Sequence, residues 1–449
     1  MPFKTLVVGS GGREHALVRG LLRSRRRPQV FCAPGNAGTD APIDGRVAQN
    51  VPIPASDLDA LVDFARRERI DLTLVGPEEP LCLGLVDRLA AAGLRAFGPT
   101  AEAAQLEGDK VFAKQLMQAT GIPTAEARIF APGGQEQILM DRPKEGGPNF
   151  VDRAFDRARA YLETRDEPLV VKASGLARGK GVFVCRDPAE AIRAAEMLMV
   201  QRVFGAAGDT ILVEERLTGR EASLLALVDG RTIYMLEAAR DYKRLNDNDA
   251  GPNTGGMGAC SMGGLLDDAL MRQIEEQIFV PIVDAMAYRG TPYRGVLYAG
   301  LMLTPGGPKV LEFNCRLGDP EAQAILMRLE GDLLEALEAA TEGRLDQADL
   351  HWDRRPSVCV VMAAAGYPDA PREGDPIEGL SDAATIQDCC VFHAGTARDA
   401  TGQVVTSGGR VLGVTALGDT TQQARERAYD AVERIRFAGM QFRRDIGQG

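Results

Sequence analysis

The sequence predicts a mixed α/β and α+β protein, with a parallel, doubly wound sheet at the N-terminus and antiparallel strands farther along. Two patterns support this prediction. In the first hundred residues, apolar strand-like runs alternate with segments of helical periodicity, which is the pattern of βαβ units. From residue 221 on, strand-like runs such as SLLALVDG and RTIYMLEAARDYKR follow one another through a short Asp-Gly turn, which is typical of a hairpin.

The N-terminal alternation contains three strong strand signals and three helix signals. The strands are expected at TLVVGS (5–10), QVFCAP (29–34) and DLTLVGP (71–77), and the helices at 13–24, 57–70 and 83–93. Ligands of such sheets bind at the carboxyl ends of the strands. The candidate binding loops are therefore SGGREH (10–15), APGNAGT (33–39) and GPEEP (76–80).

The remaining chain has a different alternation. A helix-rich connection at 101–123 is followed by a Gly- and Pro-rich stretch at 131–150 that we interpret as an exposed loop or insertion. The further elements are strands around a glycine turn at 168–185, a helix at 188–200, a strand at 210–217, a functional or disordered loop at 240–259, a helix near 266–287, two strands joined by PGGP (305–308), a helix at about 320–342, hairpins from 356 and a last helix at 421–435.

Composition limits the class of protein. The 449 residues predict two to four domains, at ~100–200 residues each. A formal net charge of −11 argues against nucleic acid as the main partner, and no apolar run predicts a membrane span or a signal peptide. The eight cysteines lack metal-binding spacing, so we expect reduced thiols and a cytoplasmic location.

Lysine is rare in this chain, because only eight of its 52 basic residues are lysines. A compact ammonium interacts with phosphate differently from a guanidinium, so each lysine invites a functional reading. Five of them fall in motif-like stretches: Lys110, Lys114, Lys172, Lys180 and Lys243. Chance clustering is the plain alternative, and Lys114 in particular could be a solvated helix residue one turn after Lys110.

Two stretches predict nucleotide binding. In KASGLARGKG (172–181), a strand ends in a lysine, and a glycine-rich turn lets backbone N–H groups approach phosphate oxygens. It is not a P-loop, because GxxxxGK[ST] is absent and a strand follows. TILVEERLTGREAS (210–223) could hold an adenine through its backbone and a ribose through a glutamate. The alternatives are an ordinary hairpin turn and a strand with a charged turn.

Two more stretches point to a reacting centre. RDYKRLNDNDAGPNTGGMGA (240–259) collects charges and glycines in a segment with little apolar content, which is usual for a functional or disordered loop. VLEFNCRLGDPEAQ (310–323) places Glu312 and Asn314 on one face of a strand, where both offer the oxygen ligands that Mg²⁺ prefers. Arg316 beyond them could hold a carboxylate or a developing negative charge. A buried polar pair is the alternative.

Taken in order, these motifs resemble the ATP-grasp superfamily and, within it, the phosphoribosylamine–glycine ligase (glycinamide ribonucleotide synthetase) family. The motifs are GSGGREHAL, VGPEEPL, GDKVFAKQLM, KASGLARGKGV, DYKR, GPNTGGMGA and EFNCRLGDPEAQ, and the resemblance continues through FHAGT and TSGGRVLGVTALG. It implies a Rossmann-like N-terminal domain (1–100), an ATP-grasp core (101–330) with a mobile lid at about 124–217, and a small β-rich C-terminal domain (331–449).

The resemblance also implies an activity. It is the ATP-dependent ligation of glycine to 5-phosphoribosylamine through a glycyl phosphate, which gives glycinamide ribonucleotide, ADP and phosphate in purine biosynthesis. The implied ligands are ATP, glycine, phosphoribosylamine and Mg²⁺ or Mn²⁺, with no nucleic acid or membrane partner, and the implied state is a monomer or weak homodimer. No protein nucleophile is needed, because positioning, charge stabilisation and exclusion of water suffice.

Residue roles follow from the same resemblance. The ATP site would include Lys110, Lys172, Gly175, Lys180, Gly181, Glu214, Leu217 and Glu221. The phosphoribosylamine site would be lined by Gly11, Gly12, Arg13, Glu78, Asn253, Thr254, Gly255, Gly256, Met257 and Asp319. The reacting centre would be bordered by Asp241, Lys243, Arg244 and Arg316, and the metal would be bound by Glu312 and Asn314.

The chain departs from the family pattern at a few positions. Ser174 stands where the family usually has Asp, Arg178 where it has Ala and Cys260 where it has Tyr, while FGAAG (204–208) lacks a customary acidic residue. Three rival functions stay open: a ligase of the same frame with another amine or acid, an oxidoreductase suggested by VVGSGGREH, and a non-catalytic nucleotide-binding regulator. The oxidoreductase motif is incomplete, because Glu14 stands at the last glycine position.

Overall fold

A computed structural model of the chain describes residues 2–133, 149–177 and 180–448. It divides into two compact units. Unit 1 comprises Met1–Ala104, Glu221–Ala299 and Asn314–Gly449, and unit 2 comprises Gln105–Arg220 and Gly300–Phe313. The predicted domain boundaries and the predicted lid stay predictions. Most of the expected 131–150 loop lies outside the described residues, and so does Arg178.

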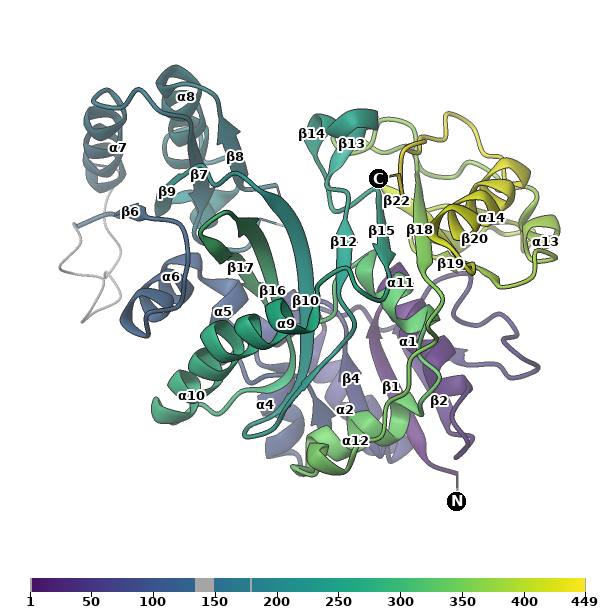
Figure 1. The fold of residues 1–449 in the computed structure, drawn as a ribbon. Helices are drawn as coiled ribbons and strands as arrows, with labels where there is room; N and C mark the ends of the chain where they lie inside the picture. The colour runs from purple at the N-terminus through teal and green to yellow at the C-terminus, as the bar shows by residue number, and fades with distance from the viewer. Residues whose placement is uncertain (1, 134–148, 178–179, 449) are drawn as a thin grey trace. The chain divides into compact units, whose positions relative to one another are not determined.

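The N-terminal part of unit 1 is the parallel sheet that the sequence predicts (Figure 1). Its strands lie in the order β3-β2-β1-β4-β5, and each neighbouring pair is parallel. The strands are β1 (Lys4–Gly9), β2 (Gln29–Pro34), β3 (Gln49–Asn50), β4 (Leu72–Val75) and β5 (Ala96–Phe97). The helices are α1 (Gly12–Leu22), α2 (Leu58–Glu68), α3 (Glu78–Cys82) and α4 (Leu85–Ala91). The three predicted binding loops therefore follow the carboxyl ends of β1, β2 and β4, as expected.

This sheet is buried on both faces, which explains why its strands are apolar throughout rather than alternating. Successive residues of β1 point to opposite faces. Leu6 and Val8 accordingly join a core with α2 residues such as Leu61, whereas Val7 joins a core with α1 residues such as Leu17. The parallel sheet thus holds the loop between β1 and α1 between two apolar layers.

A second sheet in unit 1 is antiparallel, again as predicted. It runs β10-β12-β15-β18-β22-β19, and β11 pairs with β10. These strands are β10 (Arg220–Asp229), β11 (Ile233–Met235), β12 (Ala239–Asp241), β15 (Gly258–Ser261), β18 (Ser357–Ala363), β19 (Cys389–His393) and β22 (Arg410–Leu417). The predicted Asp-Gly turn joins β10 and β11, where Asp229 accepts hydrogen bonds from the N–H groups of Arg231 and Thr232.

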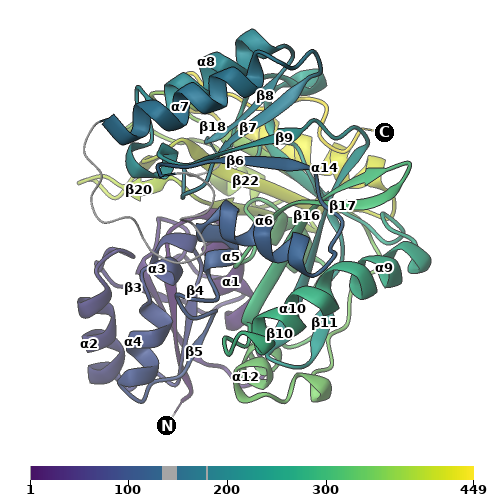
Figure 2. The same ribbon diagram turned by 90° about the vertical axis from the view of Figure 1, so that its left-hand side faces the viewer.

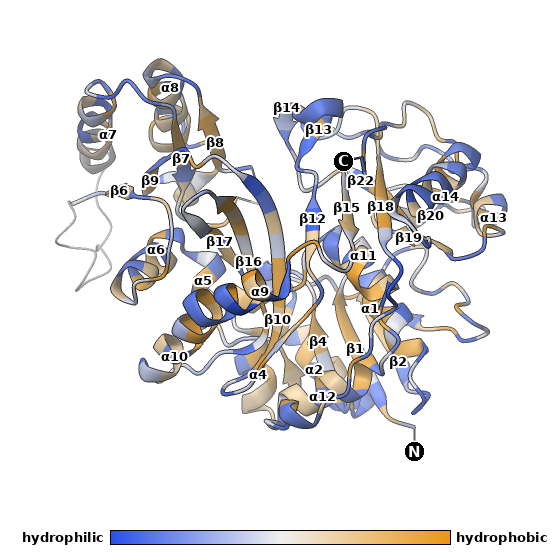
Figure 3. Ribbon diagram, in the orientation of Figure 1, coloured by the Kyte–Doolittle hydropathy of each residue, from blue (hydrophilic) through white to orange (hydrophobic). Residues whose placement is uncertain are grey.

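Helices and two small hairpins complete unit 1. In Figure 3, β18 is hydrophobic and the β13–β14 hairpin is hydrophilic, which agrees with a core strand and an exposed hairpin. The helices are α9 (Asp268–Ile274), a π-helical segment (Glu275–Phe279), α10 (Val280–Tyr288), α11 (Glu321–Met327), α12 (Leu333–Glu342), α13 (Leu380–Ala383) and α14 (Thr421–Arg434). The hairpins are β13 (Arg244–Asn246) with β14 (Ala250–Asn253), and β20 (Thr396–Arg398) with β21 (Val404–Thr406).

Unit 2 is built on an antiparallel sheet of order β6-β9-β7-β8. Its strands are β6 (Ala127–Phe130), β7 (Leu169–Ala173), β8 (Val182–Cys185) and β9 (Ile211–Glu215). Its helices are α5 (Gln105–Gly108), α6 (Lys110–Ala119), α7 (Asn149–Leu162) and α8 (Pro188–Met199). Figure 2 shows α7 and α8 side by side against this sheet, where Val171, Leu198 and Ile211 are buried together. Strands β16 (Arg294–Thr304) and β17 (Gly307–Asn314) carry the chain across the division between units.

Two expected elements are wrong in detail. The single helix expected at 320–342 is two helices, because Asp332 caps a new helix by accepting hydrogen bonds from the N–H groups of Leu334 and Glu335. The loop expected at 240–259 contains short strands, of which β13 and β14 form a hairpin. Glycine and charge had masked the strand signal in this segment.

Two of the three histidines form a buried pair in unit 1. His15 on α1 and His393 on β19 have ring centroids 5.7 Å apart, and the His393 N–H donates to His15 Nδ1 at 2.8 Å. Burial lowers the pKa of His15 to about 3, with a further contribution from the neighbouring His393. Burial likewise lowers the pKa of His393 to about 4. Both imidazoles are therefore neutral at physiological pH.

Two further expectations concern membranes and thiols. No helix among the described residues is long and apolar enough to cross a membrane. All eight cysteines are free thiols, and five of them are buried. The thiol state agrees with the expectation of reduced cysteines.

Candidate active site

The loop between β1 and α1 is closed by its own glutamate. The Gly11 N–H donates to Glu14 Oε2 at 2.5 Å, and Arg13 Nε donates to Glu14 Oε1 at 2.6 Å. A Cβ added at Gly12 would stand 2.3 Å from Gln323 Nε2, so a larger residue there would displace the Gln323 amide from its contact with Asp319. The Glu14 carboxylate also lies directly over the backbone of Gly76, at the carboxyl edge of the sheet. A carboxylate in this place repels a pyrophosphate, which argues against the oxidoreductase alternative.

Two arginines converge next to this loop. Arg13 and Arg316 both donate to the Leu317 carbonyl, at 2.9 and 3.3 Å. Arg316 Nε also lies 3.3 Å from Glu78 Oε2. Burial alone would raise the pKa of Glu78, but the charges of Arg316 and Arg13 outweigh it and hold that pKa below its ordinary value. The predicted residues Arg13, Glu78 and Arg316 thus form one charged cluster with Glu78 ionised.

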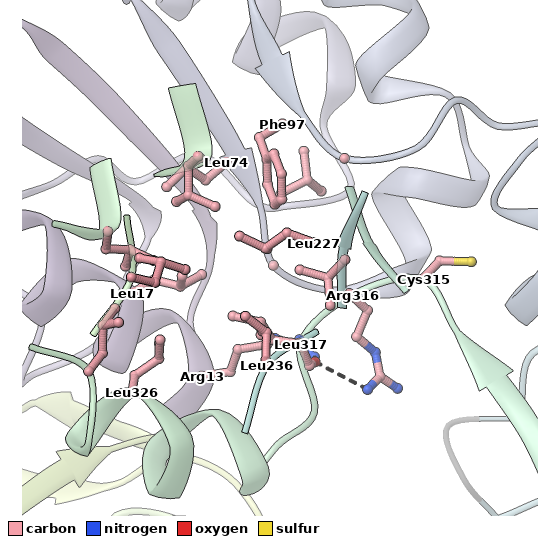
Figure 4. A pocket seen from close by; sticks show the side chains of 18 of the residues that line it. Arg13, Leu17, Leu74, Phe97, Leu227, Leu236, Cys315, Arg316, Leu317 and Leu326 are labelled. Atoms are coloured by element: carbon pink, nitrogen blue, oxygen red, sulfur yellow. Dashed lines mark hydrogen bonds between the residues drawn. The ribbon is translucent and has the colours of Figure 1, made fainter. Parts of the chain in front are cut away.

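An apolar pocket lies beside the two arginines (Figure 4). Its walls come from the parallel sheet, from β10 and from α11 and α12, and they are mostly leucine. The guanidinium of Arg316 lies on the side away from Leu17 and Leu326. The apolar wall lowers the effective dielectric constant around the arginine cluster. A lower dielectric constant strengthens the attraction of the two guanidinium groups for an anion.

Asp319 links this cluster to the glycine-rich loop before β15. It accepts hydrogen bonds from the Arg13 N–H at 3.3 Å and from Gln323 Nε2 at 2.9 Å, and its Oδ1 lies 3.5 Å from Arg410 NH1. Burial would raise the pKa of Asp319, but Arg410 and Arg13 together lower it. Arg410 NH1 also donates to the Gly255 carbonyl at 2.5 Å. One arginine from the C-terminal sheet therefore holds two predicted substrate-binding segments.

The loop 254–257 is fixed by several further contacts. The Gly255 N–H donates to the Tyr367 hydroxyl at 3.0 Å, and the Gly256 N–H donates to Thr254 Oγ1 at 3.0 Å. Gly256 has φ +112°, a conformation that favours glycine, and a Cβ there would stand 2.6 Å from Pro320. Met257 is fully buried. Its side chain is thus part of the core, and its backbone is bonded within the protein, because its N–H donates to the Tyr242 carbonyl at 2.8 Å and its carbonyl accepts from the Val361 N–H at 3.0 Å.

Asp241 is the centre of a second charged cluster. Lys243 Nζ lies 2.9 Å from Glu221 Oε2 and 3.4 Å from Asp241 Oδ1. Tyr298 donates to Glu321 Oε1 at 2.6 Å and is hydrogen-bonded to Ser223 at 2.8 Å. Burial raises the pKa of Asp241 to about 7; Lys243 opposes the shift, and Glu321 and Glu221 add to it. Asp241 can therefore exchange a proton near neutral pH.

Two other predicted residues of this segment have local contacts. Arg244 NH1 donates to the Gly251 carbonyl at 2.8 Å, across the β13–β14 hairpin. Asn253 pairs with Arg244 in the same hairpin. Their contacts in this structure stabilise the hairpin that precedes the glycine-rich loop.

In unit 2, three buried charges form a triad. Glu214 Oε2 lies 2.7 Å from Lys172 Nζ, and Glu214 Oε1 lies 2.9 Å from Lys114 Nζ. Burial raises the pKa of Glu214, but the two lysines outweigh that effect and lower it overall. Lys114 is 2% exposed, so the alternative of a solvated helix residue is wrong. The helix α6 turns this lysine inward, toward β9.

The lysine loop is anchored to the start of α6 by Ser174. Its hydroxyl donates to Asp109 Oδ1 at 2.7 Å, and its carbonyl accepts from the Lys110 N–H at 3.0 Å. A Cβ on Gly175 would stand 2.8 Å from the Ala207 backbone, and one on Gly181 would stand 2.6 Å from the Ala177 side chain. Lys180 is exposed and Leu217 half-buried. This serine, a departure from the family pattern, thus holds Lys110 next to the lysine loop.

Glu312 and Asn314 are alternate residues of β17 and offer oxygen ligands. A Cβ on Gly300 would stand 3.5 Å from Glu312 Cγ, an ordinary contact distance, so the Glu312 side chain lies beside Gly300. Asn314 Oδ1 accepts a hydrogen bond from Arg316 NH2 at 3.2 Å. No group of three or more His, Cys, Asp or Glu side chains among the described residues is arranged to bind a metal. The donor chemistry of Glu312 and Asn314 fits Mg²⁺, which takes its remaining ligands from water and phosphates.

Sequence reasoning missed several residues of these clusters. Arg410 and Tyr367 come from the C-terminal segment, and Tyr298 lies inside an apolar strand. Arg410 is the charged residue at the start of the apolar run in TSGGRVLGVTALG. This position is the sequence signal from which it could have been predicted as a site residue. Tyr298 and Tyr367 carried no signal in the sequence.

Comparisons with known proteins cover nearly the whole chain. Family models of phosphoribosylglycinamide synthetase match in three parts: the N domain at 3–107, the ATP-grasp (A) domain at 148–322 and the C domain at 357–449. A phosphoribosylamine–glycine ligase of Rhodopirellula baltica is 48% identical over 99% of this chain and 97% of the relative, and one of Caldanaerobacter subterraneus is 46% identical over 99% and 100%.

Solved structures agree. A crystal structure of phosphoribosylamine–glycine ligase from Thermotoga maritima has a TM-score of 0.79 and 33% identity, covering 98% of this chain and 99% of that one. A biotin carboxylase domain from Hydrogenobacter thermophilus has a TM-score of 0.68 at 17% identity and shows likeness of fold only.

Proposed function

The chain belongs to the phosphoribosylglycinamide synthetase family, and we propose that it ligates glycine to 5-phosphoribosylamine at the expense of ATP. The products are glycinamide ribonucleotide, ADP and phosphate, in purine biosynthesis. The match to all three family domains, together with a relative that is 48% identical over 99% of the chain, carries this proposal. The residue roles given below belong to the same proposal.

The nucleotide is proposed to bind at the lysine loop of unit 2. Lys172 and Lys110 supply positive charge for the phosphates, with Lys180 at the other end of the loop. The close contacts that a Cβ would make at Gly175 and Gly181 explain the glycines at the two ends of this loop. The segment from Leu217 to Glu221 is proposed to hold adenine and ribose, whereas Glu214, whose carboxylate binds Lys172 and Lys114, belongs to the ATP site through Lys172.

The metal is proposed to be Mg²⁺, or Mn²⁺, at Glu312 and Asn314. When bound, such an ion neutralises charge on the phosphate that is transferred. The carboxylate and the amide oxygen are both hard ligands, which supports the assignment. The hydrogen bond from Arg316 to Asn314 Oδ1 sets the direction of the Asn314 amide.

The acid and the amine are proposed to meet in unit 1. The loop at Gly11–Arg13 and the backbone at 253–257 form the phosphoribosylamine site, with Glu78 and Asp319 holding its edges. Arg316 provides a guanidinium for a carboxylate or for the charge that develops on it. The fixed hydrogen bonds of Arg13 and Asp319 support a site that is formed before the substrate arrives.

The reaction needs two substitutions and one proton acceptor. A glycine carboxylate oxygen attacks the γ-phosphorus, which forms an O–P bond and breaks the bond to ADP. The amine nitrogen then attacks the acyl carbon, which forms the amide and breaks the C–O bond to phosphate. The amine must lose a proton in this step. Asp241, with a pKa of about 7, is suited to accept it, and Lys243 beside it stabilises the negative charge.

The test is ADP formation by the purified chain with each substrate omitted in turn. The proposal expects sustained, multiple-turnover ADP formation only when glycine and phosphoribosylamine are both present, and it expects a product with the mass of glycinamide ribonucleotide. ADP formation with another acid or amine, at a higher rate, would favour a ligase of different specificity. Nucleotide binding without turnover would favour a regulator.

The cytoplasmic location and the monomeric or weakly dimeric state stay predictions.

A further inference from the structure

Lys114 is the residue of unit 2 that the proposed mechanism leaves unused. It projects from α6 and is 2% exposed, yet it carries a charged group. A buried lysine is costly unless it is paired and hydrogen-bonded. Burial accordingly lowers the pKa of Lys114, and the Glu214 charge offsets only part of that shift.

The ammonium of Lys114 is completely satisfied within unit 2. It donates to Thr124 Oγ1 at 2.7 Å and to the Ala125 carbonyl at 3.1 Å, and it lies 2.9 Å from Glu214 Oε1. Thr124 donates its own hydroxyl proton to the Val310 carbonyl, so its oxygen is oriented to accept from the lysine. An ammonium has three N–H groups, and all three are used.

Lys172 differs from Lys114 in this respect. Among the described residues it has two acceptors, Glu214 Oε2 at 2.7 Å and the Leu311 carbonyl at 3.0 Å. One of its three N–H groups is thus available to a ligand. The shared Glu214 carboxylate holds both ammonium groups, one on each oxygen.

The charges of this triad add to one positive charge. Two lysines and one glutamate leave a single uncompensated ammonium, whereas Glu214 and Lys172 alone would be neutral. The nearest further pair, Lys309 with Glu215 at 2.9 Å, is itself neutral. The positive charge that Lys172 can offer to a phosphate therefore depends on the charge of Lys114.

We propose that Lys114 is a positioning residue for nucleotide binding. It neutralises Glu214, so that Glu214 holds Lys172 in place without cancelling its charge toward the phosphates of ATP. This inference rests on the proposed function, in which Lys172 binds those phosphates. Lysine suits the position better than arginine, because a tetrahedral ammonium fits three acceptors arranged around one point, whereas a planar guanidinium does not. In a chain with only eight lysines, this preference also explains why the position is not arginine.

The experiment is calorimetric binding of MgATP, without glycine, to three variants. In Lys114→Met the triad has no net charge, and we expect the affinity for MgATP to fall about ten-fold or more, the loss typical of one charged contact. In Lys114→Met/Glu214→Gln the net charge is again one positive charge, and we expect a substantial part of the affinity to return. Lys309→Met removes the same charge from a half-exposed pair and should change the affinity less than three-fold, or about 0.65 kcal/mol.

The charge-restoring double variant separates positioning from support of the fold. If Lys114 only supports the fold, removing a second buried partner cannot restore binding, and a double variant as weak as Lys114→Met overturns the inference. If Lys114→Met does not fold, the double variant can still be tested. It should fold because Glu214→Gln removes the buried carboxylate charge that Lys114→Met leaves without one of its partners. It should then bind MgATP within about three-fold of the wild type, and weaker binding overturns the inference.

The wild-type result distinguishes the two claims. Wild-type protein that binds no MgATP contradicts the proposed function itself. Wild-type binding together with unchanged binding in Lys114→Met contradicts only the role of Lys114.

Discussion

Acid should destabilise this protein through its buried histidine pair. In the unfolded chain each imidazole takes up a proton near its ordinary pKa of 6.5, whereas in the folded chain the pKa of His15 is about 3 and that of His393 is about 4. Between these values the unfolded state binds more protons, so stability falls as the pH is lowered. The stability that the two neutral histidines contribute is fully present well above pH 6.5 and is lost progressively as the pH falls toward 4.

The size of the effect follows from proton linkage. For each extra proton that the unfolded state binds, the free energy of unfolding falls by about 1.4 kcal/mol for every pH unit of acidification. From pH 7 to pH 5 the two histidines together should lower the free energy of unfolding by about 4 kcal/mol. Asp241, whose pKa is raised to about 7 by burial, acts in the opposite direction over the same range. A comparison of two proteins that both contain Asp241 removes its contribution.

The assay is urea unfolding near pH 7 and near pH 5 for the wild type and for His15→Asn/His393→Asn. Asparagine keeps a hydrogen-bonding group near the position of Nδ1 but does not titrate, so this variant should lose about 4 kcal/mol less stability than the wild type on acidification. Equal losses in the two proteins would refute the reasoning, because the histidines would then not be neutral and buried in the folded chain. Replacing the exposed His351 by Asn serves as a control and should change nothing.

Three further predictions concern turnover. Lys172→Met should raise the ATP concentration needed for half-maximal rate by about ten-fold or more and leave the glycine requirement unchanged; unaltered nucleotide affinity in calorimetry would show that the lysine loop is assigned wrongly. Glu312→Gln should lower kcat by about 100-fold or more while circular dichroism stays the same, since loss of a carboxylate weakens the metal; normal activity at saturating Mg²⁺ would remove Glu312 from the metal site. The pKa of Asp241 is about 7 and its ionised form accepts the proton, so kcat/KM should rise with pH up to about 7 and then level off. Asp241→Asn should abolish that rise, and an unchanged pH profile in this variant would exclude Asp241 as the base.

Much of the fold was predictable because local patterns agree with the final structure. Apolar runs and helical periodicity located β1, β2 and β4 and the helices between them, and the rule for parallel sheets located their binding loops. The break between α11 and α12 was not predicted, although the Gly331-Asp332 pair is a usual cap signal. The apolar periodicity on both sides of this pair is strong enough to suggest one continuous helix.

The candidate site was predictable where chemistry is concentrated in short motifs and unpredictable where it depends on distant contacts. The rarity of lysine singled out Lys172 and Lys114, but no pattern could show that both share Glu214, because the three residues come from different elements. Arg410 reaches Gly255 across 155 positions of the chain. Contacts at such separation are fixed by strand order, which sequence periodicity does not determine.

The central claim is that this chain joins glycine to phosphoribosylamine, and mass spectrometry of a complete reaction tests it most directly. The purified protein is incubated with ATP, Mg²⁺, isotopically labelled glycine and freshly generated phosphoribosylamine. The account predicts labelled glycinamide ribonucleotide and ADP in equal amounts over many turnovers, and no labelled amide and no sustained ADP formation when either glycine or the amine is omitted. ADP without labelled amide in the complete mixture, or an amide formed only from a different acid or amine, would contradict it.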